Sequence, residues 1–162
     1  QIETATQERL QQKLADCQYL CSSPAKRCVR TCQALFPDHT PPHLIAAFWE
    51  QYFGDWEGLA YPDLPDLGSM NGQELAKFTP PNGESFLDLC ARIQPAFHSL
   101  LQDVDVQQIA VFAHAGVIRA VLALVFDSPE AALKCEIDPL SITHLRVLPD
   151  NQFSLVCINQ GG

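Results

Sequence analysis

The stretch QQIAVFAHAGVIRAVLALV, residues 107–125, decides the fold expected for this chain. An apolar run reaches His114, breaks at Ala115–Gly116, and resumes as a longer apolar run that contains Arg119. The first run has the length of a fully buried strand over 109–113, and the second predicts a helix over about 117–126. A strand that leads through a short turn into a helix is the building unit of a parallel α/β sheet. An imidazole at the joint, followed by a cation one turn later, needs a reason in such apolar surroundings.

The remaining sequence repeats this strand–helix pattern. A second unit is predicted by a short strand over 18–21, Ser23 as helix N-cap, Pro24 at the first helical position, and a helix that ends near Phe36. Further predicted elements are a surface helix over 3–16 and an irregular proline-rich segment over 41–82. Gly83-Glu84-Ser85 then leads into a predicted helix that runs to about Asp103 and is interrupted by Pro95, and two strands follow over 141–159. Together these elements predict a single domain over 1–162, a three-layer α/β/α sandwich around a mostly parallel sheet.

Composition and charge limit the classes of partner. Of the 162 residues, 47% are hydrophobic and 18% charged, which is typical of a globular domain. Ten basic against nineteen acidic residues give a net charge of −9, which repels nucleic acid and anionic lipid. No apolar run approaches the ~18 residues that span a bilayer, and the start of the chain does not resemble a signal peptide. We therefore expect a cytoplasmic protein that binds neither nucleic acid nor membrane; a homo-oligomer stays open.

The seven cysteines are expected to be reduced, small buried thiols. Cys17 and Cys21, like Cys28 and Cys32, are four residues apart in sequence. Common zinc sites use two-residue spacers in two matching pairs, which this chain lacks. We therefore expect no metal.

Cations stand where a helix least favours them. Lys26 and Arg27 fall in the first turn of one predicted helix, and Arg119 in the first turn of the other. A helix N-terminus already carries about half a positive charge, so a cation there typically costs ~0.3–1 kcal/mol. An anion reverses the balance, because N–H groups, dipole and guanidinium all attract it. Two such helix starts on one sheet edge predict a pocket for a small, highly charged anion such as phosphate.

Each of these residues also has a purely structural interpretation. Arg27 could reach solvent, Arg119 could pair with a surface carboxylate, and His114 could be a hydrogen-bonded core histidine. Glu50 lies in the aromatic stretch FWEQYFGDWEGLAY. Desolvation there would raise its pKa and favour a neutral carboxyl that donates a proton, whereas an exposed position would leave it an ordinary glutamate.

Four ordered motifs extend these observations to a family. SSPAKRCVRTCQAL, FWEQYFGDWEG, PNGESFLDLCARI and FAHAGVIRAVLA resemble, in this order, the histidine phosphatase superfamily, which includes phosphoglycerate mutases and acid phosphatases. The branch that contains alpha-ribazole phosphatase is the most similar. The resemblance runs from about Cys21 to the last predicted hairpin.

The resemblance implies phosphoryl transfer through a phosphohistidine, without metal or cofactor. Arg27 would bind the phosphoryl oxygens, and His114 would hydrogen-bond the transferring group. Glu50 would protonate the leaving alcohol and later activate water. Ala115 would add a backbone N–H, although the family normally has glycine there. The substrate would be a small phosphomonoester such as alpha-ribazole 5′-phosphate, and segment 41–82 would form the substrate side.

The chain departs from the family at the nucleophile. The Arg-His-Gly motif that follows the family's first strand does not occur in these 162 residues. That strand normally lies mid-sheet, so two neighbouring strands would each keep an unpaired apolar flank. The sequence is then either an incomplete record of a longer phosphatase, a non-catalytic module that binds phosphorylated ligands or partners, or a chain whose strand comes from a partner. A mutase is a further alternative.

Overall fold

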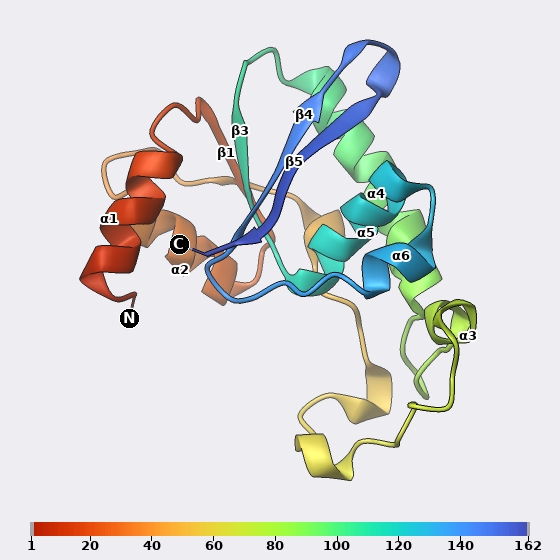
Figure 1. Ribbon diagram of the computed structural model, residues 1–162. Coiled ribbons are helices and arrows are strands. Elements are labelled where there is room, and N and C mark those ends of the chain that lie inside the picture. The colour runs from red at the N-terminus through yellow and green to blue at the C-terminus, as the bar shows by residue number, and fades with distance from the viewer. Residues whose placement is uncertain (1, 162) are drawn as a thin grey trace.

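The structure is a computed structural model that describes residues 2–161 (Figure 1). It consists of helices, strands and short 3₁₀ turns in the following order: α1 (Thr4–Lys13), β1 (Tyr19–Ser22), α2 (Lys26–Leu35), β2 (His43–Leu44), η1 (Ala46–Phe48), η2 (Gly54–Trp56), η3 (Tyr61–Asp63), α3 (Gly72–Lys77), α4 (Phe86–Asp103), β3 (Ile109–Phe112), α5 (Ala115–Phe126), α6 (Pro129–Leu133), β4 (Ile142–Val147), η4 (Pro149–Asn151) and β5 (Phe153–Gln160).

A parallel three-stranded sheet forms the centre, in the order β2-β1-β3. The register pairs Ser22 of β1 with Phe112 of β3, so the two strands end side by side. Parallel strands direct their carboxyl ends to one edge, and α2 and α5 therefore begin there. The residues that connect each strand to its helix share this edge, as the two strand–helix units predict.

Helices cover both faces of this sheet. Leu10 of α1 and Leu35 of α2 pack with Leu20 and Phe112 on one face. On the other face, α4 and α5 enclose the larger core. Figure 1 shows α1 and α2 on one side of the strands and α4 and α5 on the other. Helices on both faces confirm the predicted three-layer α/β/α sandwich. Both faces of the sheet can be covered because neighbouring side chains along a strand point to opposite faces.

Several predicted boundaries need correction. Helix α2 starts at Lys26 with Ala25 at the N-cap, so Ser23 is not its cap and Pro24 is not its first residue. Helix α5 starts at Ala115 instead of Val117, with His114 at the N-cap. Strand β3 is not fully buried, since Val111 is 38% exposed.

Helix α4 confirms the predicted helix after Gly83-Glu84-Ser85. Ser85 is its N-cap, and Ser85 and Asp88 form a reciprocal capping box. The helix runs from Phe86 to Asp103 and passes Pro95 without the predicted interruption. A short helix that we did not predict, α6, follows α5 with Ser128 as its N-cap.

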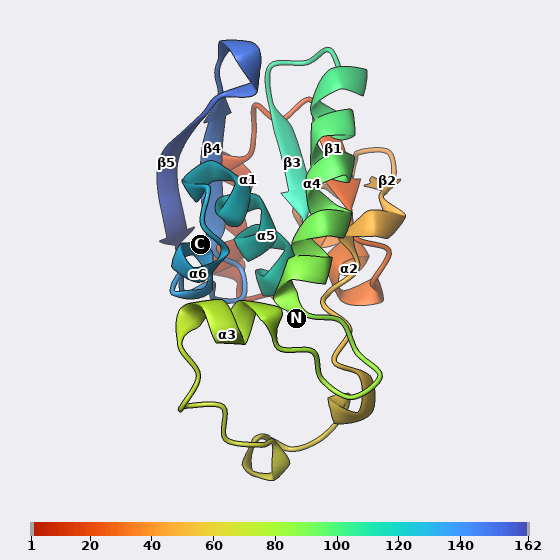
Figure 2. The same ribbon diagram turned by 90° about the vertical axis from the view of Figure 1, so that its right-hand side faces the viewer.

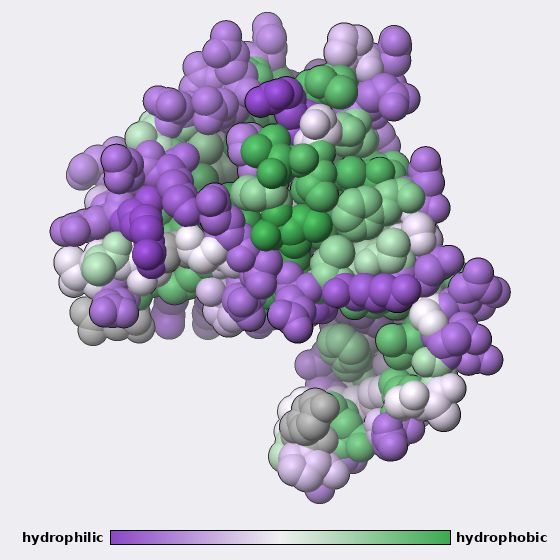
Figure 3. Space-filling model, viewed as in Figure 1, coloured by the Kyte–Doolittle hydropathy of each residue, from purple (hydrophilic) through white to green (hydrophobic). Residues whose placement is uncertain are grey.

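The last two strands form a separate antiparallel sheet, as predicted for the hairpin. Within residues 2–161, no strand pairing joins β3 to β4. Figure 2 shows β4 on the β3 side of the parallel sheet, away from β1 and β2. Apolar surface gathers over the hairpin (Figure 3), where Val147 and Val156 are both close to half exposed.

The carbonyls of Gln108 and Phe112 accept hydrogen bonds from β1. Alternate residues of a parallel strand bond to the same neighbour, so the peptide groups of Ile109 and Val111 face the other way, toward the hairpin side. This agrees with the unpaired flank that we expected for two neighbouring strands.

The segment between β2 and α3 is irregular, as predicted. The prediction of an irregular stretch over 41–82 is nevertheless wrong at β2 and at α3, a helix that begins at an Asn71–Glu74 capping box. The irregular segment is the yellow loop that projects beyond the carboxyl ends of β1 and β3 in Figure 1. Hydrogen bonds from Glu84 to Tyr52 and from Asp55 to Pro81 hold its base closed. The helices described by the structure include none long and apolar enough to cross a membrane.

We predict that Gly54→Ala destabilises the protein more than Gly58→Ala. Both glycines have a left-handed backbone, with φ of +57° and +79°. A Cβ at Gly54 would lie 2.1 Å from the Pro81 carbonyl oxygen, whereas nothing lies within 4 Å of one at Gly58. Gly58→Ala should therefore cost only the backbone strain of about 1–2 kcal/mol, and Gly54→Ala clearly more. Urea unfolding followed by circular dichroism measures both; equal losses would contradict the predicted crowding.

Candidate active site

The ring of His114 lies between the two strand–helix units. It follows β3, is 6% exposed, and is hydrogen-bonded on both nitrogens. Nε2 lies 2.8 Å from Ser23 Oγ at the end of β1, and Nδ1 lies 2.8 Å from Nη2 of Arg27 in α2. The thiol of Cys28 contacts both ring nitrogens at 3.7–3.8 Å. The predicted convergence of Arg27 and His114 is therefore present in the structure.

These contacts determine which nitrogen carries the proton. A guanidinium can only donate, so Nδ1 of His114 must accept from Arg27. The proton of the neutral ring is then on Nε2, which donates to Ser23 Oγ. Burial and, next, the Arg27 charge lower the pKa of His114 to about 4. At neutral pH the ring is uncharged.

Arg27 is an exposed residue whose guanidinium contacts the site. The residue as a whole is exposed, but its guanidinium reaches His114 rather than extending only into solvent. Its neighbour Lys26 is also exposed. One of the two first-turn cations of α2 thus contacts the site.

Arg119 makes a contact that the sequence did not predict. Its Nε donates to the carbonyl oxygen of Cys135 at 2.8 Å, which ties α5 to the segment after α6. This bond engages Nε with a backbone carbonyl and not with a surface carboxylate. Its charge nevertheless acts on Glu50, as described next.

Glu50 reaches the site from the loop after η1. Its Oε2 accepts from the Gly116 N–H at 3.5 Å, and its Oε1 from the Gln51 N–H at 2.9 Å. Burial raises its pKa above the ordinary value; the two N–H groups, Arg27 and Arg119 act in the opposite direction. The carboxyl is half-buried, as its aromatic surroundings suggested, and stands at the helix start that follows His114.

Arg92 fixes the loop that carries Glu50, a role that sequence reasoning missed. From α4, its guanidinium donates to the carbonyls of Ala47, Trp49 and Glu50, and it forms a 2.5 Å ion pair with Glu84. Three carbonyls on one guanidinium hold the backbone on both sides of the glutamate. A lone arginine on a predicted helix gave no signal of this.

Ala115 is the first residue of α5 and is half-buried. Its φ is not among the positive values found in the chain, so the alanine is accommodated without strain where the family normally has glycine. The first N–H groups of a helix have no intrahelical acceptor, and those of Ala115 and Gly116 adjoin His114.

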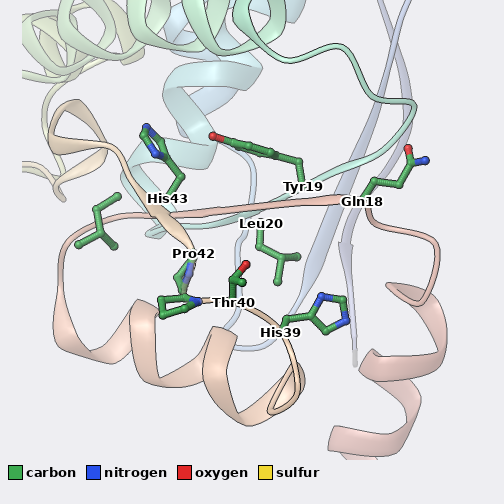
Figure 4. Close-up of a pocket in the computed structure, with 9 residues that line it drawn as sticks. Gln18, Tyr19, Leu20, His39, Thr40, Pro42 and His43 are labelled. Atoms are coloured by element: carbon green, nitrogen blue, oxygen red, sulfur yellow. The ribbon is translucent and has the colours of Figure 1, made fainter.

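The other four histidines lie elsewhere. His39 packs against Phe36, His43 against Tyr19 and His98 against Phe153, while His144 belongs to β4. A shallow depression of about 450 Å³ lies along residues 18–20 and 39–44. Figure 4 shows His39 and His43 there, on opposite sides of the β1 ribbon. This depression adjoins the start of β1 and is distinct from the candidate site at the strand's end.

The chain also matches a known family in sequence. The sequence model of the histidine phosphatase superfamily (branch 1) matches residues 3–161. The chain belongs to the histidine phosphatase superfamily.

Two curated relatives and one solved structure illustrate its place in the superfamily. A bifunctional protein of Mycobacterium tuberculosis is 28% identical over 118 residues, covering 70% of this chain and 32% of the relative. The adenosylcobalamin/alpha-ribazole phosphatase of Escherichia coli is 28% identical over 119 residues, covering 70% of the chain and 58% of the relative. The chain thus spans between a third and three fifths of these relatives. A mycobacterial glucosyl-3-phosphoglycerate phosphatase has the same fold, with a TM-score of 0.82 at 22% identity over 98% of this chain and 84% of that one.

We predict that Gly116→Ala moves Glu50 without unfolding the protein. A Cβ at this position would lie 2.3 Å from Glu50 Oε1, the end of a flexible side chain. The carboxylate would turn toward solvent, and its raised pKa would fall toward the ordinary value because it loses burial. Carboxyl-carbon NMR measures this pKa in the protein, in Gly116→Ala and in the control Gly58→Ala. An unchanged Glu50 pKa in Gly116→Ala would contradict the contact.

Proposed function

We propose that this chain carries the phosphate-binding and acid–base groups of a phosphatase that hydrolyses a small phosphomonoester. The observation that carries the proposal is the convergence of Arg27, His114 and Glu50 at the starts of α2 and α5. Two helix N-termini and a guanidinium favour a dianion at this place. A half-buried carboxyl with a raised pKa beside them can supply a proton.

In this proposal a histidine outside the 162 residues is the nucleophile. Its ring nitrogen bonds to phosphorus while the ester P–O bond breaks, and Glu50 transfers its proton to the leaving alkoxide. Water then attacks the phosphorus of the phosphohistidine, and the Glu50 carboxylate takes a proton of that water. The N–P bond breaks, which frees the histidine and releases inorganic phosphate. Arg27, His114 and the N–H of Ala115 bind the phosphoryl oxygens throughout, so that most of the catalysis is electrostatic.

The divided sheet supports a nucleophile from another segment. An extended segment between β3 and β4 would use the peptide groups of Ile109 and Val111 that face the hairpin side. If it ran parallel to β3, its carboxyl end would lie beside His114. A residue that follows such a strand would stand within the candidate site.

The substrate is proposed at two levels. The site geometry supports a phosphomonoester in general, and the E. coli relative supports alpha-ribazole 5′-phosphate as the first compound to test. The loop between β2 and α3 is proposed as the substrate-side insert, because it carries Glu50 and lies beyond the strand ends with Trp49 and Tyr52 about half exposed.

A non-catalytic phospho-ligand-binding or assembly module is the second candidate. It is favoured by one observation: His39, His43, His98 and His144, the remaining histidines, all lie outside the site. A mutase, which transfers the phosphoryl group to another molecule, is the third candidate function. Its site would differ from that of a phosphatase in how well it excludes water.

Turnover of p-nitrophenyl phosphate without added metal tests the proposal. The protein to use is the full polypeptide that contains these residues. Arg27→Ala and His114→Ala should each lower kcat/KM at least about a hundredfold, because each removes a charge or donor from the phosphoryl group. Lys26→Ala is the matched control and should change it little. Equal rates in the parent, Arg27→Ala and His114→Ala proteins would refute the proposed site, whereas phosphate binding without turnover in the parent would select the binding module.

A comparison of leaving groups tests the role of Glu50. Glu50→Gln should reduce hydrolysis of an alkyl phosphate far more than that of p-nitrophenyl phosphate, because nitrophenolate leaves without needing a proton. The raised pKa keeps the carboxyl protonated to a higher pH, so activity toward the alkyl ester should decline as pH rises through that pKa. Equal losses on both substrates would contradict a proton-donating role.

A further inference from the structure

Ser23 is held rigidly at the end of β1. It is fully buried, and its N–H donates to the carbonyl of Phe112 at 2.8 Å. Its hydroxyl oxygen accepts from the Ala25 N–H at 3.2 Å and lies 2.8 Å from Nε2 of His114. Both the backbone and the side chain of Ser23 are therefore fixed relative to the His114 ring.

The two ring nitrogens of His114 consequently have different partners. Arg27 donates to Nδ1, and Ser23 accepts from the proton on Nε2. Nδ1 is thus the nitrogen on the guanidinium side, where the proposed function places the phosphoryl group.

An Nδ1 atom that carries no proton cannot donate a hydrogen bond to phosphate. Phosphoryl oxygens of a dianion only accept hydrogen bonds, and an unprotonated Nδ1 also only accepts. For His114 to donate to the anion while Nε2 keeps donating to Ser23, Arg27 must turn from Nδ1 to the anion and Nδ1 must gain a proton from solvent. The ring then carries both protons and a positive charge, with Nε2 still donating to Ser23.

We infer that Ser23 is a positioning residue that keeps Nδ1 of His114 facing the anion, and that oxyanion binding is coupled to uptake of one proton at Nδ1. This inference rests on the proposed function and specifies how the site accepts a dianion. In the anion-free protein the ring is neutral near pH 7, which is the starting state that the coupling requires.

The charges around His114 are consistent with this coupling. Arg27 and the Cys28 thiol face it from α2, Arg119 lies on α5 one turn away, and Glu50 reaches Gly116 from the loop. Burial and the Arg27 guanidinium oppose a proton on the ring. A bound dianion adds two negative charges next to Arg27 and reverses this effect.

Sulfate is a suitable probe, because it is a dianion that carries no proton at pH 7. Titration calorimetry in buffers of different ionisation enthalpy counts the protons taken up, and ¹⁵N NMR of the His114 ring reports each nitrogen. We expect about one proton per bound sulfate, with Nδ1 changing from an unprotonated to a protonated shift. Sulfate binding without proton uptake would overturn the inference and leave the proposed function standing. If neither the parent protein nor Arg27→Ala binds sulfate, both the inference and the proposed function are overturned.

Ser23→Ala tests the positioning role. Losing a hydrogen bond to a charged ring should weaken sulfate binding about tenfold. It should also let the unanchored ring turn Nδ1 away from Arg27, so that the Nδ1–H form of the neutral ring appears in the NMR spectrum. Ser23→Thr keeps the hydroxyl and should restore both. The control is Ser22→Ala, whose equally buried hydroxyl donates to the Ser23 carbonyl. An unchanged tautomer and affinity in Ser23→Ala would overturn the positioning role; if that variant does not fold, Ser23→Thr losing the parent tautomer would overturn it equally.

Discussion

The parallel pairing of β1 with β3 is the constraint on which the candidate site depends. Because Ser22 is in register with Phe112, the residues that follow each strand emerge at the same level and are forced together. Ser23 and Arg27 come from one strand–helix unit and His114 from the other, and they are bonded only because the two strands end side by side. A shift of register by one residue would turn these side chains to opposite faces.

The electrostatic arrangement has a cost in the anion-free protein. Arg27 lies at a helix N-terminus, next to a ring whose neutral form is stabilised by burial and by the same guanidinium. The Arg27–His114 hydrogen bond offsets part of this cost. The site is therefore kept ready for a negative group without holding a second positive charge in its absence. Glu50 is placed by Arg92 and Glu84, which belong to a different part of the fold. The acid–base group is thus positioned by other residues than the anion-binding groups, although Arg27 and the Gly116 N–H also act on its pKa.

Much of this could be predicted from the sequence. Local patterns were sufficient for the three layers, the two strand–helix units, helix α4 and the final hairpin, since each depends on apolar periodicity and on caps within a few residues. The choice of Arg27, Glu50 and His114 came from cations at helix starts, an aromatic setting, and resemblance to the superfamily. The same patterns did not predict the contact of Arg119 with the Cys135 carbonyl, because it depends on helix α6, which was not predicted either. Ser23 was taken for a helix cap, although its hydroxyl oxygen lies against a ring 91 residues away in sequence. Arg92 gave no sequence signal, because its acceptors are backbone carbonyls on a loop more than 40 residues earlier.

The central claim is that these groups enclose a place for one phosphoryl oxyanion. A crystal structure of the protein with tungstate, located by its anomalous scattering, tests it most directly. The account predicts one strong peak within hydrogen-bonding distance of the Arg27 guanidinium, His114 Nδ1 and the Ala115 N–H, with Glu50 opposite. Tungstate bound only elsewhere, for instance along residues 39–44, would contradict it.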